Sequence, residues 1–173
     1  MKDNPQIRTA QPADLDDIAE LAGSKDRALV RLQAAGRGED SMLVAVASGV
    51  LLGTTSIRWA DGCDPPHPWL YGLAVAEHAR GQGIGRSLVR AAEAAAAARS
   101  AAAMSLDTDV DALSTVAFYQ HLGYRMICGH EHRWRSLDPR TGAVTATGTA
   151  PTWIMRKWLA PQQHHLHNPV GEG

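Results

Sequence analysis

The sequence of 173 residues has little cysteine, few aromatic side chains and almost no net charge. Its two cysteines, Cys63 and Cys128, are too few for the disulfide framework that holds many small secreted domains together. The 17 lysine and arginine residues are balanced by 18 acidic residues, so no net positive field draws the chain to polyanions. We therefore expect neither nucleic acid nor a membrane among its partners.

Long hydrophobic runs are also missing. The longest uncharged run, residues 41–57, is interrupted by Ser48-Gly49 and by Gly53, so it does not read as a membrane span. The first residues lack the apolar stretch of a secretory signal. These two absences lead us to expect a soluble protein of the cytoplasm.

What the sequence does contain is enough apolar material for one core, since 45% of its residues are hydrophobic. We expect a single domain over residues 1–160. The segment 161–173 is polar and has no hydrophobic periodicity, which predicts a disordered tail.

The hydrophobic periodicity predicts a mixed α/β (α+β) fold with the element order β-α-α-β-β-β-α-β-α-β-β. The expected strands cover residues 6–9, 42–47, 50–59, 69–75, 104–108, 124–134 and 151–158. The expected helices cover residues 12–22, 26–35, 86–103 and 113–121. Ser48-Gly49 is typical of a two-residue hairpin turn, and the segment between the last two strands is expected to extend their hairpin.

The segment that points most directly to chemistry is the glycine-rich turn Arg80-Gly81-Gln82-Gly83-Ile84-Gly85, between a buried strand and a long helix. A helix start leaves main-chain N–H groups unpaired and carries partial positive charge, and glycine lets a ligand approach closely. The turn therefore predicts a cradle for an anion such as a pyrophosphate. Arg86-Ser87 after Gly85 excludes the Walker pattern, and Gly85 comes too early for the dinucleotide fingerprint.

The surroundings of this turn resemble one known family. Arg80-x-x-Gly83-x-Gly85 matches the [Q/R]-x-x-G-x-[G/A] signature of the GNAT superfamily of acyl-CoA N-acyltransferases, and Leu73-x-Val75 is similar to that family's fourth strand. Downstream, Ser114-x-x-Ala117-Phe118-Tyr119-x-x-x-Gly123-Tyr124 resembles its second motif, although asparagine is commonest where Ser114 stands. The resemblance extends from Ile7 to about Leu159.

The resemblance implies a GNAT fold, with a mixed sheet of about seven strands, about four helices, and the fourth and fifth strands splayed around acetyl-CoA. Acetyl-CoA would be a co-substrate, with no metal. The main chain of the fourth strand would pair with the pantetheine arm, and the glycine turn would hold the pyrophosphate. The implied cofactor-binding residues are Leu73, Ala74, Val75, Arg80, Gly81, Gln82, Gly83, Ile84, Gly85, Arg86, Ser87 and Ser114.

The same resemblance implies catalytic roles. The Leu73 N–H would hold the developing oxyanion, and Tyr119 would protonate the leaving thiolate. We take Asp107, at the end of the fifth strand, as the expected base. Three other groups remain open for that role, namely Asp109, Glu77 and His78.

His130 and His132 alternate along an expected strand, so both would lie on one face. Two ligands make a poor metal site, but the pair could line a substrate pocket. The tail histidines His164, His165 and His167 have no matching ligands around them, and we expect no metal there either.

Three functions compete at this stage. The first is acetyl transfer from acetyl-CoA to the primary amine of a small molecule, and the second is acetylation of a protein amino terminus or lysine. The third is an acyl-CoA-binding sensor without catalysis. The excursion over residues 136–150 would narrow the acceptor side, which favours a small molecule, and exposed strand edges near the carboxyl terminus make a homodimer an open expectation.

Overall fold

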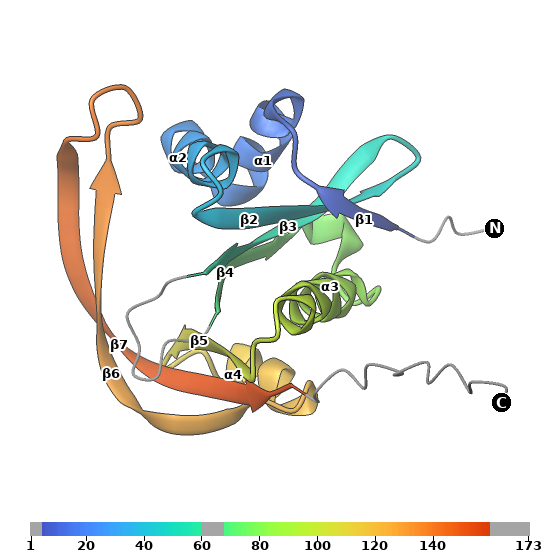
Figure 1. Cartoon of the computed structure of the whole chain (residues 1–173), viewed down its shortest axis with the longest axis vertical. Helices are drawn as coiled ribbons and strands as arrows, with labels where there is room; N and C mark the ends of the chain where they lie inside the picture. The colour runs from blue at the N-terminus through green and yellow to red at the C-terminus, as the bar shows by residue number, and fades with distance from the viewer. Residues whose placement is uncertain (1–4, 60–67, 160–173) are drawn as a thin grey trace, which may run out of the picture.

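The computed structural model describes residues 5–59 and 68–159, in which a seven-stranded sheet carries helices on both faces (Figure 1). The strands are β1 (Gln6–Thr9), β2 (Asp40–Ala47), β3 (Val50–Arg58), β4 (Trp69–Val75), β5 (Ala103–Asp109), β6 (Arg125–Leu137) and β7 (Val144–Trp158). The helices are α1 (Leu15–Ala22), α2 (Lys25–Gly36), α3 (Ile84–Ala98) and α4 (Leu113–His121), with 3₁₀ turns η1 (Pro12–Asp14) and η2 (Glu77–Ala79). Apart from these two turns, the order confirms the prediction. No helix among the described residues is long and apolar enough to cross a membrane.

The sheet is mixed, and one strand pair within it opens. The strand order is β1-β2-β3-β4-β5-β7-β6, and every neighbouring pair is antiparallel except β4 and β5. This parallel pair is in register only at Trp69 and Ser105, where the Ser105 N–H donates to the Pro68 carbonyl at 3.0 Å. The rest of β4 runs on without pairing to β5. The predicted splay of these two strands is therefore confirmed.

Two apolar layers cover the faces of the sheet. On one face, Ile18 of α1 and Ala28 of α2 pack against residues of β2 and β3. On the other, α3 and α4 pack against β3, β4, β5 and β7, through the buried residues Val89, Ala92, Ala96, Val116 and Tyr119. A Cβ built at Gly53 would lie 3.0 Å from Leu88 Cδ1. The small residues on both sides therefore let α3 approach the sheet closely.

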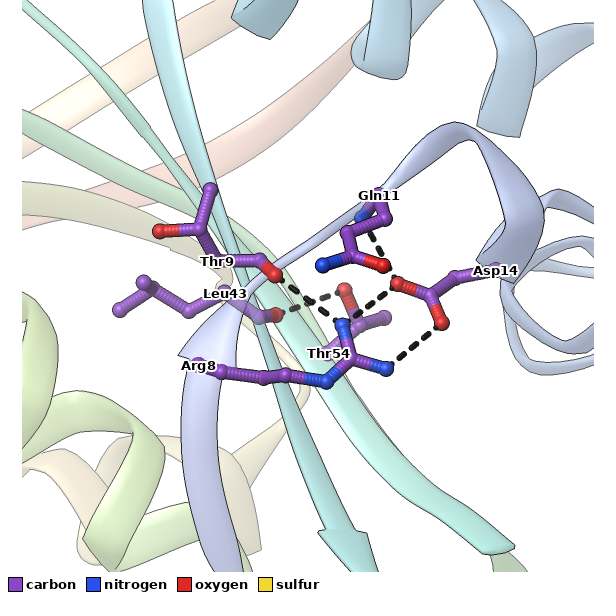
Figure 2. A network of polar contacts seen from close by, with 6 residues as sticks. All are labelled: Arg8, Thr9, Gln11, Asp14, Leu43 and Thr54. Atoms are coloured by element: carbon purple, nitrogen blue, oxygen red, sulfur yellow. Dashed lines mark hydrogen bonds and ion pairs between the residues drawn. The ribbon is translucent and has the colours of Figure 1, made fainter. Parts of the chain in front are cut away.

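The junction between β1 and α1 is fixed by a polar network (Figure 2). Both terminal nitrogens of Arg8 donate to the Asp14 carboxylate at 2.8 Å, and the Gln11 N–H donates to the same group at 2.7 Å. The hydrogen bonds from Arg8 are the largest cause of the lowered pKa of Asp14. Beside them, the Thr54 hydroxyl donates to the Leu43 carbonyl at 3.1 Å. The network sets the point at which the chain leaves the sheet for its first helix.

Helix α3 differs in its bounds from the expected 86–103. It begins at Ile84, two residues early, and ends at Ala98. Ser100 adopts a φ of +60°, which reverses the chain so that β5 can begin at the buried Ala103. The alanine-rich composition favours a helix throughout this stretch and could not show where packing against the sheet ends it.

Strands β6 and β7 form a hairpin of 13 and 15 residues, longer than the two strands predicted separately. Its turn is closed by the Asp138 carboxylate, which accepts from the Arg140 N–H at 2.7 Å. The Gln33 side chain of α2 donates to the Pro139 carbonyl in this turn at 3.3 Å. Figure 1 shows the far end of the hairpin rising beside the sheet to the level of α2. The hairpin therefore links the β5 edge of the splayed pair to the opposite helical layer.

Candidate active site

A cavity of about 340 Å³ lies where β4 and β5 have parted. Three of its lining residues, Leu73, Asp107 and Tyr119, are the ones that the sequence predicts as catalytic, and they come from β4, β5 and α4. Among the residues that the structure describes, the lining consists of Leu70, Tyr71, Gly72, Leu73, Asp107, Thr108, Asp109, Ala112, Thr115, Tyr119, His132 and Thr152. The fold thus brings the three predicted catalytic residues to one place.

The charge of this lining has one sign. Asp107 and Asp109 contribute carboxylates, whereas within residues 5–59 and 68–159 no lysine or arginine lines the cavity. Such a cavity attracts a cationic group and disfavours an anionic one. Asp61 and Asp64, which could have added to this charge, lie outside the described residues.

Tyr119 is buried, with 6% of its surface exposed, and yet it reaches the cavity. Burial raises the pKa of its phenol, and the nearby Asp107 carboxylate raises it further. Its ring packs edge-on against Phe118 and Tyr124, with centroids 5.0 and 5.6 Å away. The hydroxyl therefore stays protonated and is held in place as a hydrogen-bond donor.

Strand β4 bulges where it lines the cavity. The register with β3 shifts between Thr54 and Ser56, leaving Gly72 and Leu73 without Cα partners in β3. Gly72 has a φ of +62°, and a Cβ there would come within 2.7 Å of the Arg31 guanidinium. Glycine is therefore required at this position both for its conformation and for space.

Arg31 supports the bulge from the opposite side. Its guanidinium, in a residue only 6% exposed, donates to the Gly72 carbonyl at 3.2 Å and to the Ser56 hydroxyl at 2.8 and 3.0 Å. Burial lowers the pKa of Arg31, although a guanidinium still stays charged. Next to it, the Tyr71 hydroxyl donates to the Asp40 carboxylate. This buried network holds the part of β4 from which the Leu73 N–H projects.

The glycine turn forms the start of α3. Gly81 and Gly83 have φ values of +73° and +84°, and a Cβ at either position would meet nothing within 4 Å. The first α-helical hydrogen bond runs from the Ser87 N–H to the Gly83 carbonyl. The N–H groups of residues 84–86 therefore have no helical acceptor, as the prediction of an anion cradle requires.

The other residues of the turn serve different purposes. The Arg80 side chain donates to the Val75 carbonyl at 3.2 Å, and the Gln82 side chain donates to the His78 carbonyl at 3.1 Å, so both brace the turn against the end of β4. Gly85 has an ordinary helical conformation. A Cβ there would make ordinary van der Waals contact with Phe118 at 3.5 Å, so neither conformation nor space restricts this position to glycine.

Several residues that the sequence predicts for the site do not line the cavity. Ser114 is exposed on the first turn of α4, and Thr115 lines the cavity instead. Glu77 and His78, two of the alternative bases, are exposed and lie outside the lining. Of the two histidines expected on one face of a strand, His132 lines the cavity and the exposed His130 does not. The tail histidines lie outside the described residues.

Asp107 has a partner in the fold that the sequence pattern does not predict. His132 Nδ1 lies 2.8 Å from Asp107 Oδ2. The two residues are far apart in the chain, and β7 lies between their strands in the sheet. No local spacing could have predicted this contact.

Comparison with known proteins places these features in context. The model of the acetyltransferase (GNAT) family matches residues 9–124, which is more than half of the chain. A sequence search of curated proteins gave no significant match.

Many solved structures share the fold. An N-acetyltransferase from Staphylococcus aureus Mu50 superposes with a TM-score of 0.71 at 15% identity, covering 91% of this chain and 99% of that one. A phosphinothricin acetyltransferase from Sinorhizobium meliloti, in complex with AcCoA, gives 0.69 at 17%, covering 93% and 95%. The ribosomal-protein-S18-alanine N-acetyltransferase from Escherichia coli gives 0.69 at 15%, covering 95% and 99%. At these identities the likeness concerns the fold.

Proposed function

The chain belongs to the GNAT acetyltransferase family, and from this premise we propose that it transfers the acetyl group of acetyl-CoA to the primary amine of a small molecule. The amine would attack directly, with both substrates bound. The observation that carries the proposal is the cavity between the parted strands, which has acidic side chains, a buried tyrosine and a main-chain bulge in its wall. These groups match the needs of amine acetylation.

The residues of the glycine turn fit acetyl-CoA. Free space at Gly81 and Gly83 and the unused N–H groups of residues 84–86 suit a pyrophosphate. The unpaired edge of β4, from Leu73 through Ala74 to Val75, suits the amide-bearing pantetheine arm, which would add to the sheet as a strand does. When bound, acetyl-CoA supplies an activated thioester.

The chain's own groups would then stabilise the reaction. The Leu73 N–H would donate to the acetyl oxygen as negative charge develops there, an interaction worth about 3 kcal/mol in other acyl transfers. The Tyr119 hydroxyl would give its proton to the departing thiolate. The Thr108 hydroxyl is buried in the same wall and has no hydrogen-bond partner among the described residues, so it is available to a bound substrate.

One feature supports a small acceptor over a protein segment, and a second supports a cationic acceptor. The hairpin turn reaches α2 through the Gln33–Pro139 contact, which narrows the side from which an extended peptide would enter. The Asp107 and Asp109 carboxylates favour an ammonium group. The alternatives are acetylation of a protein amino terminus or lysine, as the name of the ribosomal-protein-alanine enzyme indicates for that relative, and a sensor without catalysis.

The test is thiol release from acetyl-CoA in the presence of a panel of acceptors, with mass spectrometry of the products. Small mono- and diamines, amino acid derivatives and peptides with free amino termini or lysines make up the panel. We expect turnover with small cationic amines and little with peptides. Preference for peptides would favour protein acetylation, and tight acetyl-CoA binding without turnover on any acceptor would favour the sensor.

A further inference from the structure

His132 and Asp107 form a pair that faces the cavity. His132 extends from β6 across β7, and its Nδ1 lies 2.8 Å from Asp107 Oδ2 on β5. The Asp107 side chain is 14% exposed, whereas the His132 side chain is 39% exposed. The carboxylate is thus largely enclosed while the imidazole remains accessible from the cavity.

The contact determines which imidazole nitrogen is available. An ionised carboxylate can only accept a hydrogen bond, so Nδ1 must carry the proton and donate it to Asp107. In the neutral ring Nε2 then has a free lone pair. A fixed tautomer with Nε2 unprotonated is what a general base requires.

The other polar groups of the lining are less suited to this task. The Tyr71 hydroxyl donates to Asp40, and the Thr152 hydroxyl donates to the His130 carbonyl. Tyr119 holds its proton because burial raises its pKa. Asp109 is exposed at the end of β5, and carboxylates are generally weaker bases than imidazole.

We propose that His132 is the catalytic base that accepts the proton of the acceptor's ammonium group, and that Asp107 is a positioning residue that orients the His132 ring. This proposal rests on the proposed function and assigns to His132 the role of base that the sequence analysis expects of Asp107. Asp107 already accepts a hydrogen bond from His132, so its nearer oxygen is engaged.

The proton and electron balance is complete without a further reactant. His132 Nε2 takes one proton from the ammonium group, and the neutral nitrogen attacks the acetyl carbon. A carbon–nitrogen bond forms, the carbon–sulfur bond breaks, and its electron pair leaves on sulfur. The nitrogen loses a second proton as the intermediate collapses. Tyr119 gives its proton to the thiolate and regains one when the nitrogen loses its second proton, while the first proton reaches solvent from His132.

The first experiment compares His132→Gln with His130→Gln, a matched change two residues along β6 at a side chain that lies outside the cavity. Steady-state kinetics are measured from pH 5.5 to 9.5 with the best amine found, next to direct acetyl-CoA titration. The titratable groups that share the cavity with His132 are Tyr71, Asp107, Asp109 and Tyr119. We expect His132→Gln to lower kcat by ~10²-fold or more and to remove the ascending limb of the pH profile.

In the same experiment, His130→Gln is expected to keep both the rate and the profile, and both variants should bind acetyl-CoA as the wild type does. Exogenous imidazole should restore part of the activity of His132→Gly, which leaves room for the added base. An unchanged ascending limb in His132→Gln would overturn the assignment of the base. No transfer by the wild type to any amine would instead count against the proposed function.

The second experiment tests Asp107 as a positioning residue. NMR of ¹⁵N-labelled histidine reports the tautomer of His132, with the His132→Gln spectrum identifying its signal. We expect the Nδ1–H tautomer in the wild type and a mixture in Asp107→Asn, together with a lower kcat at an unchanged KM for acetyl-CoA. If Asp107→Asn lost activity with the His132 signal unchanged, Asp107 would act directly and not through His132.

Discussion

At the scale of single residues, burial determines what the side chains of the cavity can do. Tyr119 lies in the apolar layer between α4 and the sheet, where two aromatic rings hold it. Its raised pKa keeps the phenol neutral, so it is a donor whose position is fixed by packing. Tyr119 can therefore have both a packing role and a catalytic role. Only a variant that removes the hydroxyl and keeps the ring can distinguish the two roles.

Tyr119→Phe makes that separation. We expect kcat to fall by ~10²-fold, because the thiolate loses its proton donor, while acetyl-CoA affinity hardly changes. Tyr124→Phe is the matched control, since this buried tyrosine contacts Tyr119 but does not line the cavity. Kinetics and acetyl-CoA titration of both variants give the answer. Equal turnover in Tyr119→Phe and the wild type would reduce Tyr119 to a packing residue.

Asp14 gives a prediction about pH. Folding lowers its pKa, mainly through the Arg8 hydrogen bonds, so its stabilisation is complete above the carboxyl's unfolded pKa of ~3.9. That stabilisation is lost as the pH falls through the lower pKa of the folded state. Asp14→Asn should cost about 2 kcal/mol at pH 7, and the difference from the wild type should shrink below about pH 3.

Denaturant unfolding at several pH values measures this effect. Asp16→Asn is the control, because its pair with Lys25 is exposed, and it should change the free energy of unfolding by less than about 1 kcal/mol. A loss for Asp14→Asn that stayed constant as the pH fell well below 3 would show that its charge is not the cause.

The sequence predicts those cavity residues that belong to a recognisable motif. It does not predict those that reach the cavity only through contacts between distant parts of the chain. Leu73 and Tyr119 follow from their places beside recognisable motifs. Arg31 carried no signal, because a charged residue in an amphipathic helix is ordinarily read as solvent-facing, yet the structure buries it beneath Gly72. The His132–Asp107 contact depends on the curvature of the hairpin, which no local pattern encodes.

At the scale of elements, the glycine turn has both a left-handed backbone conformation and open space in which a ligand can approach the main chain. Gly83→Val would force a β-branched residue into a left-handed conformation and place its side chain where the phosphates are expected. We expect acetyl-CoA affinity to fall at least ~10-fold. Gly23→Val is the control, since Gly23 also has a positive φ and open space but ends α1, away from the turn.

Thermal unfolding of each variant measures the effect of backbone strain on stability. Calorimetric titration with acetyl-CoA measures the loss of contacts to the phosphates. Both variants should lose comparable stability, whereas only Gly83→Val should lose binding. Wild-type affinity in Gly83→Val would contradict the assignment of the turn to the pyrophosphate.

Most elements were predictable because their periodicity is strong, and their ends were less so. The hairpin turn at Ser48-Gly49 has the two positive φ values that its sequence indicates. The predicted end of α3 lies five residues beyond the observed one at Ala98, because alanine is compatible with a helix, a turn and a buried strand. The β6–β7 hairpin extends through the segment between the two predicted strands, as expected, but the bounds of its strands were not predictable because its middle is exposed on both faces.

At the scale of the whole molecule, the single register contact between β4 and β5 leaves two parts of the sheet joined by few hydrogen bonds. A ligand that bridges the parted strands should therefore stabilise the fold. At about 100 times its dissociation constant, acetyl-CoA should add about 2.7 kcal/mol and raise Tm by about 5–10 °C.

Differential scanning calorimetry in excess chelator measures this shift. The metal-free expectation requires that the shift persist in chelator, because the phosphates would meet main-chain N–H groups and no cation. Coenzyme A lacking the acetyl group is a useful comparison, since it keeps the phosphates and the pantetheine arm. A shift abolished by chelator would contradict metal-free binding.

The hairpin has a consequence for how acceptor specificity can change. The family match ends at residue 124, and β6 begins at Arg125. The proposed donor-binding residues precede this boundary, whereas His132, Thr152 and the turn that reaches α2 follow it. Under the proposed function, the acceptor side would combine this hairpin with Asp107 and Asp109, which precede the boundary. A transplanted hairpin would have to keep both the register in which Asp107 faces Ile154 and the contact of His132 with Asp107, so its exchange could change the acceptor side only around these two contacts.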